Sequence, residues 1–131
     1  MILMDTCATI WDALEPAKLT KKALNAINNA DQQNALIISD ISIWEISMLI
    51  KKGRIQVETT AANFINLFLQ SRNISVQYIS PEIAELSVNF GPEINNDPAD
   101  RIIAATSIIH NSQIVTADQN LLESEMLDTI W

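Results

Sequence analysis

Short apolar runs alternate with helical patterns along the whole chain. Five runs have the length and composition of strands: ILM at 2–4, LIIS at 36–39, VQYI at 76–79, QIVT at 113–116 and TIW at 129–131. The segments between them predict helices at 8–14, 21–30, 43–53, 60–71, 81–90, 98–110 and 120–126. Because parallel strands need long crossovers, this order predicts an α/β fold with a parallel sheet between helices.

Length and composition favour a single domain over residues 1–131. About half of the residues are hydrophobic (48%), which is too many for a disordered chain. No apolar run approaches the ~18 residues of a membrane helix, so no membrane partner is expected. The only cysteine, Cys7, cannot form an internal disulfide, and a cytoplasmic location is therefore predicted.

Four acidic residues are expected at one edge of the sheet. Asp5 and Asp118 directly follow strands, and Glu45 lies in the predicted first turn of the helix after LIIS. Asp100 lies in the first turn of the predicted helix that leads into QIVT, and such a helix runs antiparallel to its strand. Its N-terminus therefore lies at the carboxyl edge, where open parallel sheets bind ligands.

Four converging carboxylates need a counter-charge. Two unit charges ~4 Å apart repel by about 4 kcal/mol at an effective dielectric constant of 20. Oxygen ligands without a Cys/His cluster favour Mg²⁺, with Mn²⁺ as a second choice, over zinc. These acids supply half of the net charge of −8. A divalent ion would let an acidic protein hold an anionic phosphodiester and orient the water that hydrolyses it.

Each acid also has a structural interpretation. Asp5 and Asp118 could be turn residues, and Glu45 could favour the helix dipole. Asp97 stands before Pro98 as a helix cap, and Asp100 could complete a reciprocal cap with it. No single acid is specific for a metal site, and only their joint position at one edge favours the functional interpretation.

Four stretches together resemble the PIN-domain ribonucleases, in particular the VapC toxins of toxin–antitoxin pairs. They are MILMDTCATIW, SDISIWEISMLIKKGRI, DPADRIIAATS and IVTADQNL. The resemblance implies a three-layer α/β/α fold with a central five-stranded parallel sheet in the order 3-2-1-4-5. It also implies a Mg²⁺-dependent endoribonuclease, an RNA substrate, a neutralising antitoxin and a homodimer, for which the helix at 60–71 is a candidate surface.

The same resemblance assigns residues to the site. The family's four acids match Asp5, Glu45, Asp100 and Asp118. Asp97 is assigned mainly to capping, with a role in the outer shell of the metal left open.

Further residues beside the acids are candidates for supporting roles. The hydroxyl groups that resemble supporting family positions are those of Thr6, Ser42 and Thr116, with backbone capping as the alternative. Arg101 could contact RNA, pair with an acid or remain a solvated helix charge. Lys51, Lys52 and Arg54 could contact RNA, although a favourable interaction with the helix end explains the first two.

Two other function classes stay open. One is a binding protein of the same fold without turnover. The other is a receiver-like phosphoacceptor domain, which would need an Asp after the third strand and a late Lys. The third strand ends in YIS and no Lys follows Lys52, so the receiver-like alternative is disfavoured.

Overall fold

The computed structural model describes the whole chain, Met1 to Trp131. Its strands are β1 (Ile2–Met4), β2 (Leu36–Ser39), β3 (Ser75–Gln77), β4 (Gln113–Val115) and β5 (Thr129–Ile130). All pairings are parallel, and the order is β3-β2-β1-β4-β5. The predicted parallel sheet and its order are therefore confirmed. A flavodoxin-like receiver sheet has the order 2-1-3-4-5, so the receiver-like alternative is wrong.

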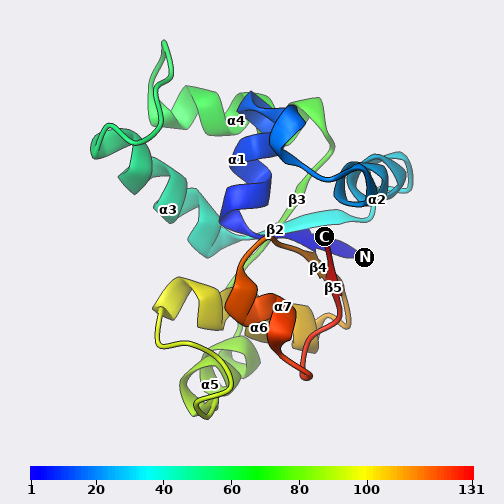
Figure 1. Cartoon of the computed structure of the whole chain (residues 1–131). Coiled ribbons are helices and arrows are strands. Elements are labelled where there is room, and N and C mark those ends of the chain that lie inside the picture. Colours follow the sequence, from blue (N-terminus) through cyan, green and yellow to red (C-terminus); the bar gives the residue numbers. More distant parts are fainter.

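Helices cover the sheet in two layers (Figure 1). They are α1 (Thr6–Leu14), the 3₁₀ turn η1 (Pro16–Lys18), α2 (Lys21–Gln32), α3 (Asp40–Lys51), α4 (Ala61–Ser71), α5 (Pro81–Asn89), α6 (Pro98–Ile109) and α7 (Gln119–Glu123). Helices α1 to α4 lie on one side of the strands and α5 to α7 on the other (Figure 1). None of the helices has the length and apolar character needed to cross a membrane.

Alternation along the strands supplies both faces of the core. The face under α1 to α4 takes Met4, Leu36, Ile38, Val115 and Ile130. The opposite face takes Leu3, Ile37 and Ile114, which pack on Ile103 of α6. Every residue of β2 is buried, as expected for a strand that is covered on both sides.

The helix that carries Glu45 begins earlier than predicted. Ser39, the last residue of β2, caps α3 by accepting the N–H of Ile41 at 3.2 Å. The helix therefore begins at Asp40 rather than near residue 43, and Glu45 lies in its second turn. The prediction of a first-turn position was wrong because the strand passes into the helix without a loop.

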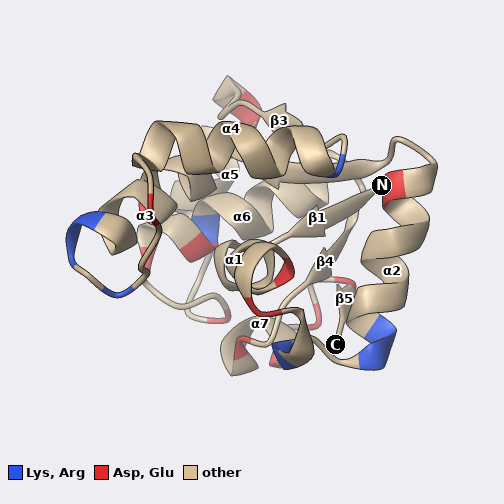
Figure 2. Cartoon of the chain, turned by 90° about the horizontal axis from the view of Figure 1, so that it is seen from above, with Lys and Arg blue, Asp and Glu red and all other residues tan.

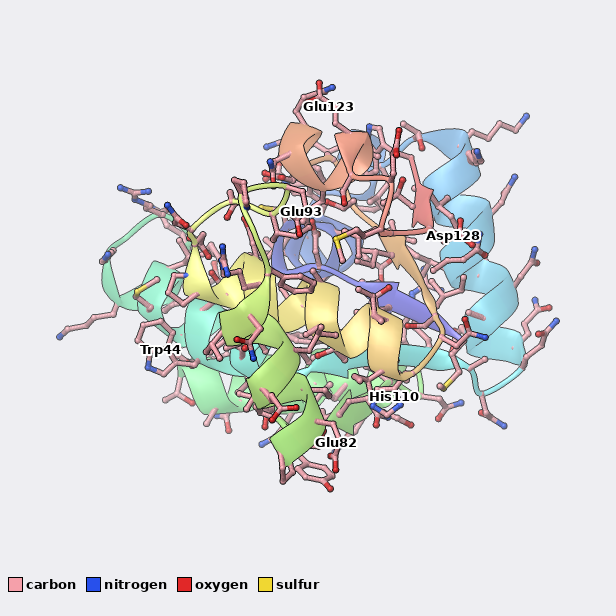
Figure 3. The ribbon with its side chains drawn as sticks, turned by 90° about the horizontal axis from the view of Figure 1, so that it is seen from below. Trp44, Glu82, Glu93, His110, Glu123 and Asp128 are labelled. Atoms are coloured by element: carbon pink, nitrogen blue, oxygen red, sulfur yellow. The ribbon has the colours of Figure 1, made fainter.

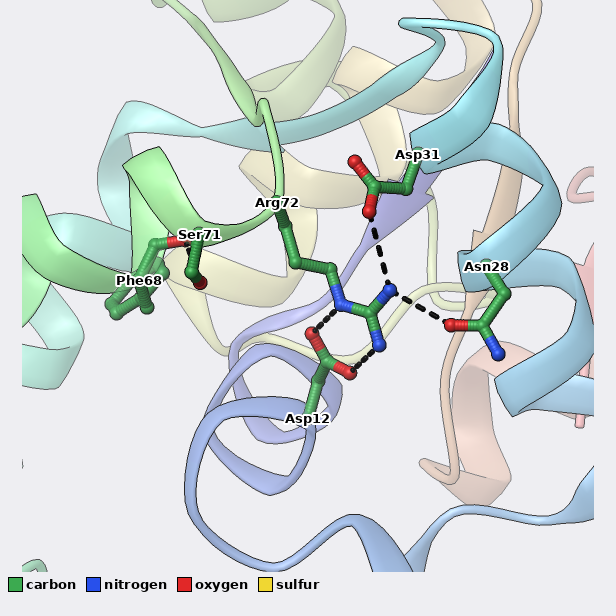
Figure 4. Close-up of polar contacts among 6 residues, drawn as sticks. All are labelled: Asp12, Asn28, Asp31, Phe68, Ser71 and Arg72. Carbon is green, nitrogen blue, oxygen red and sulfur yellow. Dashed lines mark hydrogen bonds and ion pairs between the residues drawn. The ribbon is translucent and has the colours of Figure 1, made fainter.

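A half-buried arginine at the end of α4 connects that helix to the helices beside it (Figure 4). The Arg72 guanidinium donates two hydrogen bonds to the Asp12 carboxylate, at 2.8 and 2.9 Å. It also donates to Asn28 at 2.8 Å and to Asp31 at 3.4 Å, both on α2. The Asp12 side chain is only 6% exposed, so this bidentate pair holds a buried charge where α1, α2 and α4 meet.

Candidate metal-dependent active site

Three helices begin at capping aspartates on the carboxyl edge of the sheet: Asp5 for α1, Asp97 for α6 and Asp118 for α7. In each case one carboxylate oxygen accepts the backbone N–H three residues further on, at 2.8 to 3.0 Å. The positive ends of these helix dipoles therefore face the acids, which favours negative charge there. The capping role predicted for Asp97 is confirmed.

Asp5 is the most buried of the acids, with 6% of its surface exposed. Its second oxygen accepts a hydrogen bond from the Thr116 hydroxyl at 2.5 Å, and that hydroxyl accepts the Asp118 N–H at 3.0 Å. Burial raises the pKa of Asp5 to about 6, and the charges of Asp100 and Asp118 add to the rise. The hydrogen bonds from Thr116 and the backbone of Ala8 act in the opposite direction.

Glu45 reaches the same edge from α3. The Thr6 hydroxyl donates to its carboxylate, and the hydroxyl groups of Thr6 and Ser42 lie 2.9 Å apart. Both hydroxyls are buried between α1 and α3. Burial raises the pKa of Glu45, as do the charges of Asp97 and Asp100, while the hydrogen bond from Thr6 lowers it. The hydroxyls thus hold the side chain in place although it lies one turn later than predicted.

Asp100 is held by a residue that the sequence pattern did not single out. Its carboxylate accepts a hydrogen bond from the Asn95 side-chain amide at 2.9 Å. Asn95 also accepts the Asp97 N–H at 2.8 Å and donates its own N–H to Asn120 at 3.0 Å. Asp97 therefore receives no reciprocal cap from Asp100, and that alternative was wrong. Burial, followed by the charges of Asp97 and Asp118, raises the pKa of Asp100.

Arg101 organises the loop that carries Asn95. Its guanidinium donates to the Asn95 carbonyl at 2.8 Å and to further backbone carbonyls of Ser87, Phe90, Gly91 and Ile94. It pairs with none of the acids, so the expected acid pair and the solvated helix charge were both wrong. An Asn two residues before a capping Asp is the only sequence signal that could have identified this arrangement.

The four acids act electrostatically on one neighbour, Cys7 in the first turn of α1. Cys7 is exposed, but partial desolvation raises the pKa of its thiol to about 11, and the charges of Asp5, Glu45, Asp100 and Asp118 all contribute. The structure therefore brings the four sequence-predicted acids to the same region. The only histidine, His110, caps the opposite end of α6, about 15 Å along the helix from Asp100 (Figure 3).

The donor set at this edge fits a hard divalent cation. All its ligands would be oxygens, and burial and mutual repulsion raise the pKa of three of the acids. No three acidic, histidine or cysteine side chains lie close enough together to enclose an ion by themselves. An ion here would be held by one or two carboxylates with water in the other positions, which is the usual coordination of Mg²⁺.

This fold and this arrangement of acids define a known class, and the chain belongs to the PIN-domain family. The family model matches residues 2–124. Among characterised proteins, the chain is 31% identical to ribonuclease VapC22 of Mycobacterium tuberculosis (strain ATCC 25618 / H37Rv) over 120 residues, which cover 92% of this chain and 88% of the relative.

Solved structures show the same fold at low sequence identity. VapBC2 from Rickettsia felis, bound to a DNA fragment from its promoter, contains a chain that matches with a TM-score of 0.73 and 18% identity. The match covers 98% of this chain and 97% of that one. FitAcB from Neisseria gonorrhoeae matches with a TM-score of 0.66 and 17% identity, covering 98% and 96%.

Proposed function

We propose that this chain is a Mg²⁺-dependent endoribonuclease toxin that hydrolyses RNA phosphodiester bonds and is neutralised by a cognate antitoxin. The main support is the gathering of four carboxylates from separate parts of the chain at the carboxyl edge of the sheet. The 31% identity to a protein named a ribonuclease supports the reaction class. The residues 1–131 would act as one PIN domain.

Asp5, Asp100 and Asp118 would hold one or two Mg²⁺ ions, each bound by one or two of these carboxylates with water in its other positions. Glu45 would bind directly or through water, and Mn²⁺ is expected to substitute. When bound, the ion would stabilise the charge that develops on the phosphate and would lower the pKa of a water so that this water can attack the phosphorus. The Thr116 hydroxyl donates a hydrogen bond to one oxygen of Asp5 and lowers the pKa of that carboxyl. With a pKa of about 6, Asp5 can ionise near neutral pH. Glu45, which accepts a hydrogen bond from Thr6, would accept a proton from a water at this edge.

The proposal includes two protein partners. An antitoxin is inferred because the structural matches include a toxin–antitoxin complex from Klebsiella pneumoniae, with a TM-score of 0.61 and 21% identity. A homodimer is inferred from exposed apolar side chains on two helices: Leu67 of α4 is 63% exposed, and Trp44 of α3 is 60% exposed and points outward (Figure 3). We infer a cytoplasmic location from the proposed RNA substrate and from the lone Cys7, which suits a reducing compartment.

Metal removal tests the proposed reaction. The purified protein is expected to cleave RNA in Mg²⁺ or Mn²⁺, to lose all cleavage in EDTA, and to regain it when the metal is added back. Electrophoresis of the products and sequencing of their 5′ ends measure the reaction. Cleavage that continues in EDTA would refute the metal site. Metal binding without any cleavage of cellular RNA would favour a binding protein without turnover.

Asn95→Ala is expected to lower the rate of RNA cleavage by about 10- to 100-fold, the usual effect of losing a group that orients a metal ligand. The amide donates to the Asp100 carboxylate at 2.9 Å, so its loss frees that carboxylate to rotate. A steady-state assay should show the loss in kcat rather than in KM. Asn96→Ala, on the adjacent exposed residue, is the matched control, and an equal loss there would contradict the positioning role.

A further inference from the structure

The basic residues of this acidic chain are unequally available to a ligand. Of eight, Arg72 and Arg101 are committed to internal contacts, and Lys18 forms an ion pair with Glu15 at 3.3 Å. The remaining five are Lys21 and Lys22 at the start of α2, and Lys51, Lys52 and Arg54 at the end of α3. None of these five side chains has an ion-pair partner or a side-chain hydrogen bond.

A groove of about 500 Å³ lies beside α1 and the end of α3. Its lining begins at Cys7, which follows Thr6, the hydrogen-bond donor to Glu45, and continues over Trp11 and Leu49 to Arg54 and Ile55. Six of the ten lining residues are hydrophobic, and the ion pair of Glu15 and Lys18 also lines the groove, whereas Lys52 lies beside it. The volume is typical of ligand-binding clefts. The groove therefore connects the carboxylate site with the basic end of α3.

One face of α3 runs along the same path. Glu45, Leu49 and Lys52 stand at positions i, i+4 and i+7, which share a face of a helix, and Glu45 and Lys52 are about 10 Å apart along the axis. Gly53, with a φ of 74°, turns the chain after Lys52 and brings Arg54 to the groove. Figure 2 shows basic residues gathered at this end of α3 and in the loop beyond it.

We propose that single-stranded RNA lies along this groove and that Lys52 and Arg54 bind its backbone phosphates, which deepens the proposed nuclease function and depends on it. Phosphates need cations, and this end of α3 offers unpaired ones next to the groove. The apolar wall around Trp11 suits the faces of unpaired bases. A peptide segment of the antitoxin is the competing occupant. The Glu15 and Lys18 charges in the wall offset each other, so the unpaired cations at the end of α3 favour a strand of phosphates.

The test compares two double variants that each remove two positive charges. Lys52→Gln/Arg54→Gln changes the proposed site, and Lys21→Gln/Lys22→Gln changes two exposed lysines at the start of α2 that do not line the groove. Both are made in an Asp100→Asn background, so that a short, fluorescein-labelled single-stranded RNA of random sequence is bound but not cleaved. Fluorescence anisotropy in Mg²⁺ gives the affinity between about 50 and 200 mM salt.

The groove variant is expected to lose affinity by about tenfold for each phosphate contact at low salt, and its slope of log affinity against log salt should fall by about 0.7 for each contact. In the active protein the same two changes should raise KM and leave kcat nearly unchanged. Equal losses in both double variants would overturn the proposal, as would a groove variant that keeps its RNA affinity and salt slope but is no longer neutralised by the antitoxin.

The outcomes separate this proposal from the proposed function. If the protein with all four acids cleaves RNA and the groove variant binds RNA as tightly as the control, only the RNA path is wrong. If the protein with all four acids cleaves no RNA in Mg²⁺, the nuclease function itself fails. Circular dichroism spectra and melting temperatures of both double variants confirm that each is folded.

Discussion

Asp5→Asn is expected to lower Mg²⁺-dependent RNA cleavage by more than about a hundredfold and, at neutral pH, to make the metal-free protein more stable. The loss of activity should exceed the 10- to 100-fold effect of an outer-shell change, because a candidate metal ligand is removed. The fold should survive, because the asparagine oxygen can still accept the Ala8 N–H and cap α1. Thr116 can then accept from the new amide instead of donating to the carboxylate.

The gain in stability follows from the raised pKa of Asp5. The ordinary value is 3.8 and the folded value is about 6, so the folded state binds the proton more tightly than the unfolded state does. The stabilisation from this proton is complete below pH 3.8 and is lost as the pH rises to about 6. A shift of about two units corresponds to about 3 kcal/mol, and the asparagine should recover about 1 to 3 kcal/mol above pH 6.

Urea unfolding in EDTA at several pH values between 3.8 and 7 measures the difference between Asp5→Asn and the unchanged protein. The difference should grow with pH and level off above pH 6, and Mg²⁺ should stabilise only the unchanged protein. Asp97→Asn is the matched control, since Asp97 caps α6 and is exposed. It should retain most of the cleavage activity. Full activity of Asp5→Asn would remove that residue from the site.

Arg72→Leu is expected to destabilise the protein by about 3 to 5 kcal/mol, the usual cost of leaving a buried charge without its partner. The Asp12 side chain, 6% exposed, would lose both hydrogen bonds of the bidentate pair. Because small domains are stable by only about 5 to 15 kcal/mol, the change would remove a large part of the total.

Urea denaturation measures this cost, and two variants test its cause. Arg72→Leu combined with Asp12→Asn should recover part of the loss, because the uncompensated charge is then absent. Arg54→Leu, at an exposed arginine without an ion pair, should change the free energy of unfolding by no more than about 0.5 kcal/mol. A loss of under 1 kcal/mol in Arg72→Leu would show that Asp12 finds water or another donor.

The sequence was sufficient to predict the parallel sheet and the edge of the sheet at which the acids meet. The apolar runs marked all five strands, and Pro81 and Pro98 after Ser80 and Asp97 marked two helix starts. These features are local: they depend on periodicity, on the fixed φ of proline and on the hydrogen bond of a cap. The order of the strands came from the family resemblance, which covers nearly the whole chain.

The contacts made by longer side chains could not be predicted in the same way. Arg101 donates to carbonyls that lie up to 14 residues before it, and Arg72 reaches Asp12 across 60 residues of sequence. No local pattern shows which of several acceptors such a side chain will find. The start of α3 was misjudged for a different reason, since Ser39 is both the last residue of β2 and the helix cap.

Asp5 and Asp118 start helices as well as belonging to the candidate site, so a replacement that silences the enzyme need not unfold it. Asparagine keeps the capping oxygen at either position, whereas alanine does not. Where the active protein harms the cell that makes it, a single change to asparagine at either position would therefore abolish the activity. The fold and the surface that partners recognise would remain. We expect harmless descendants of such genes to accumulate asparagine at these two positions more often than alanine.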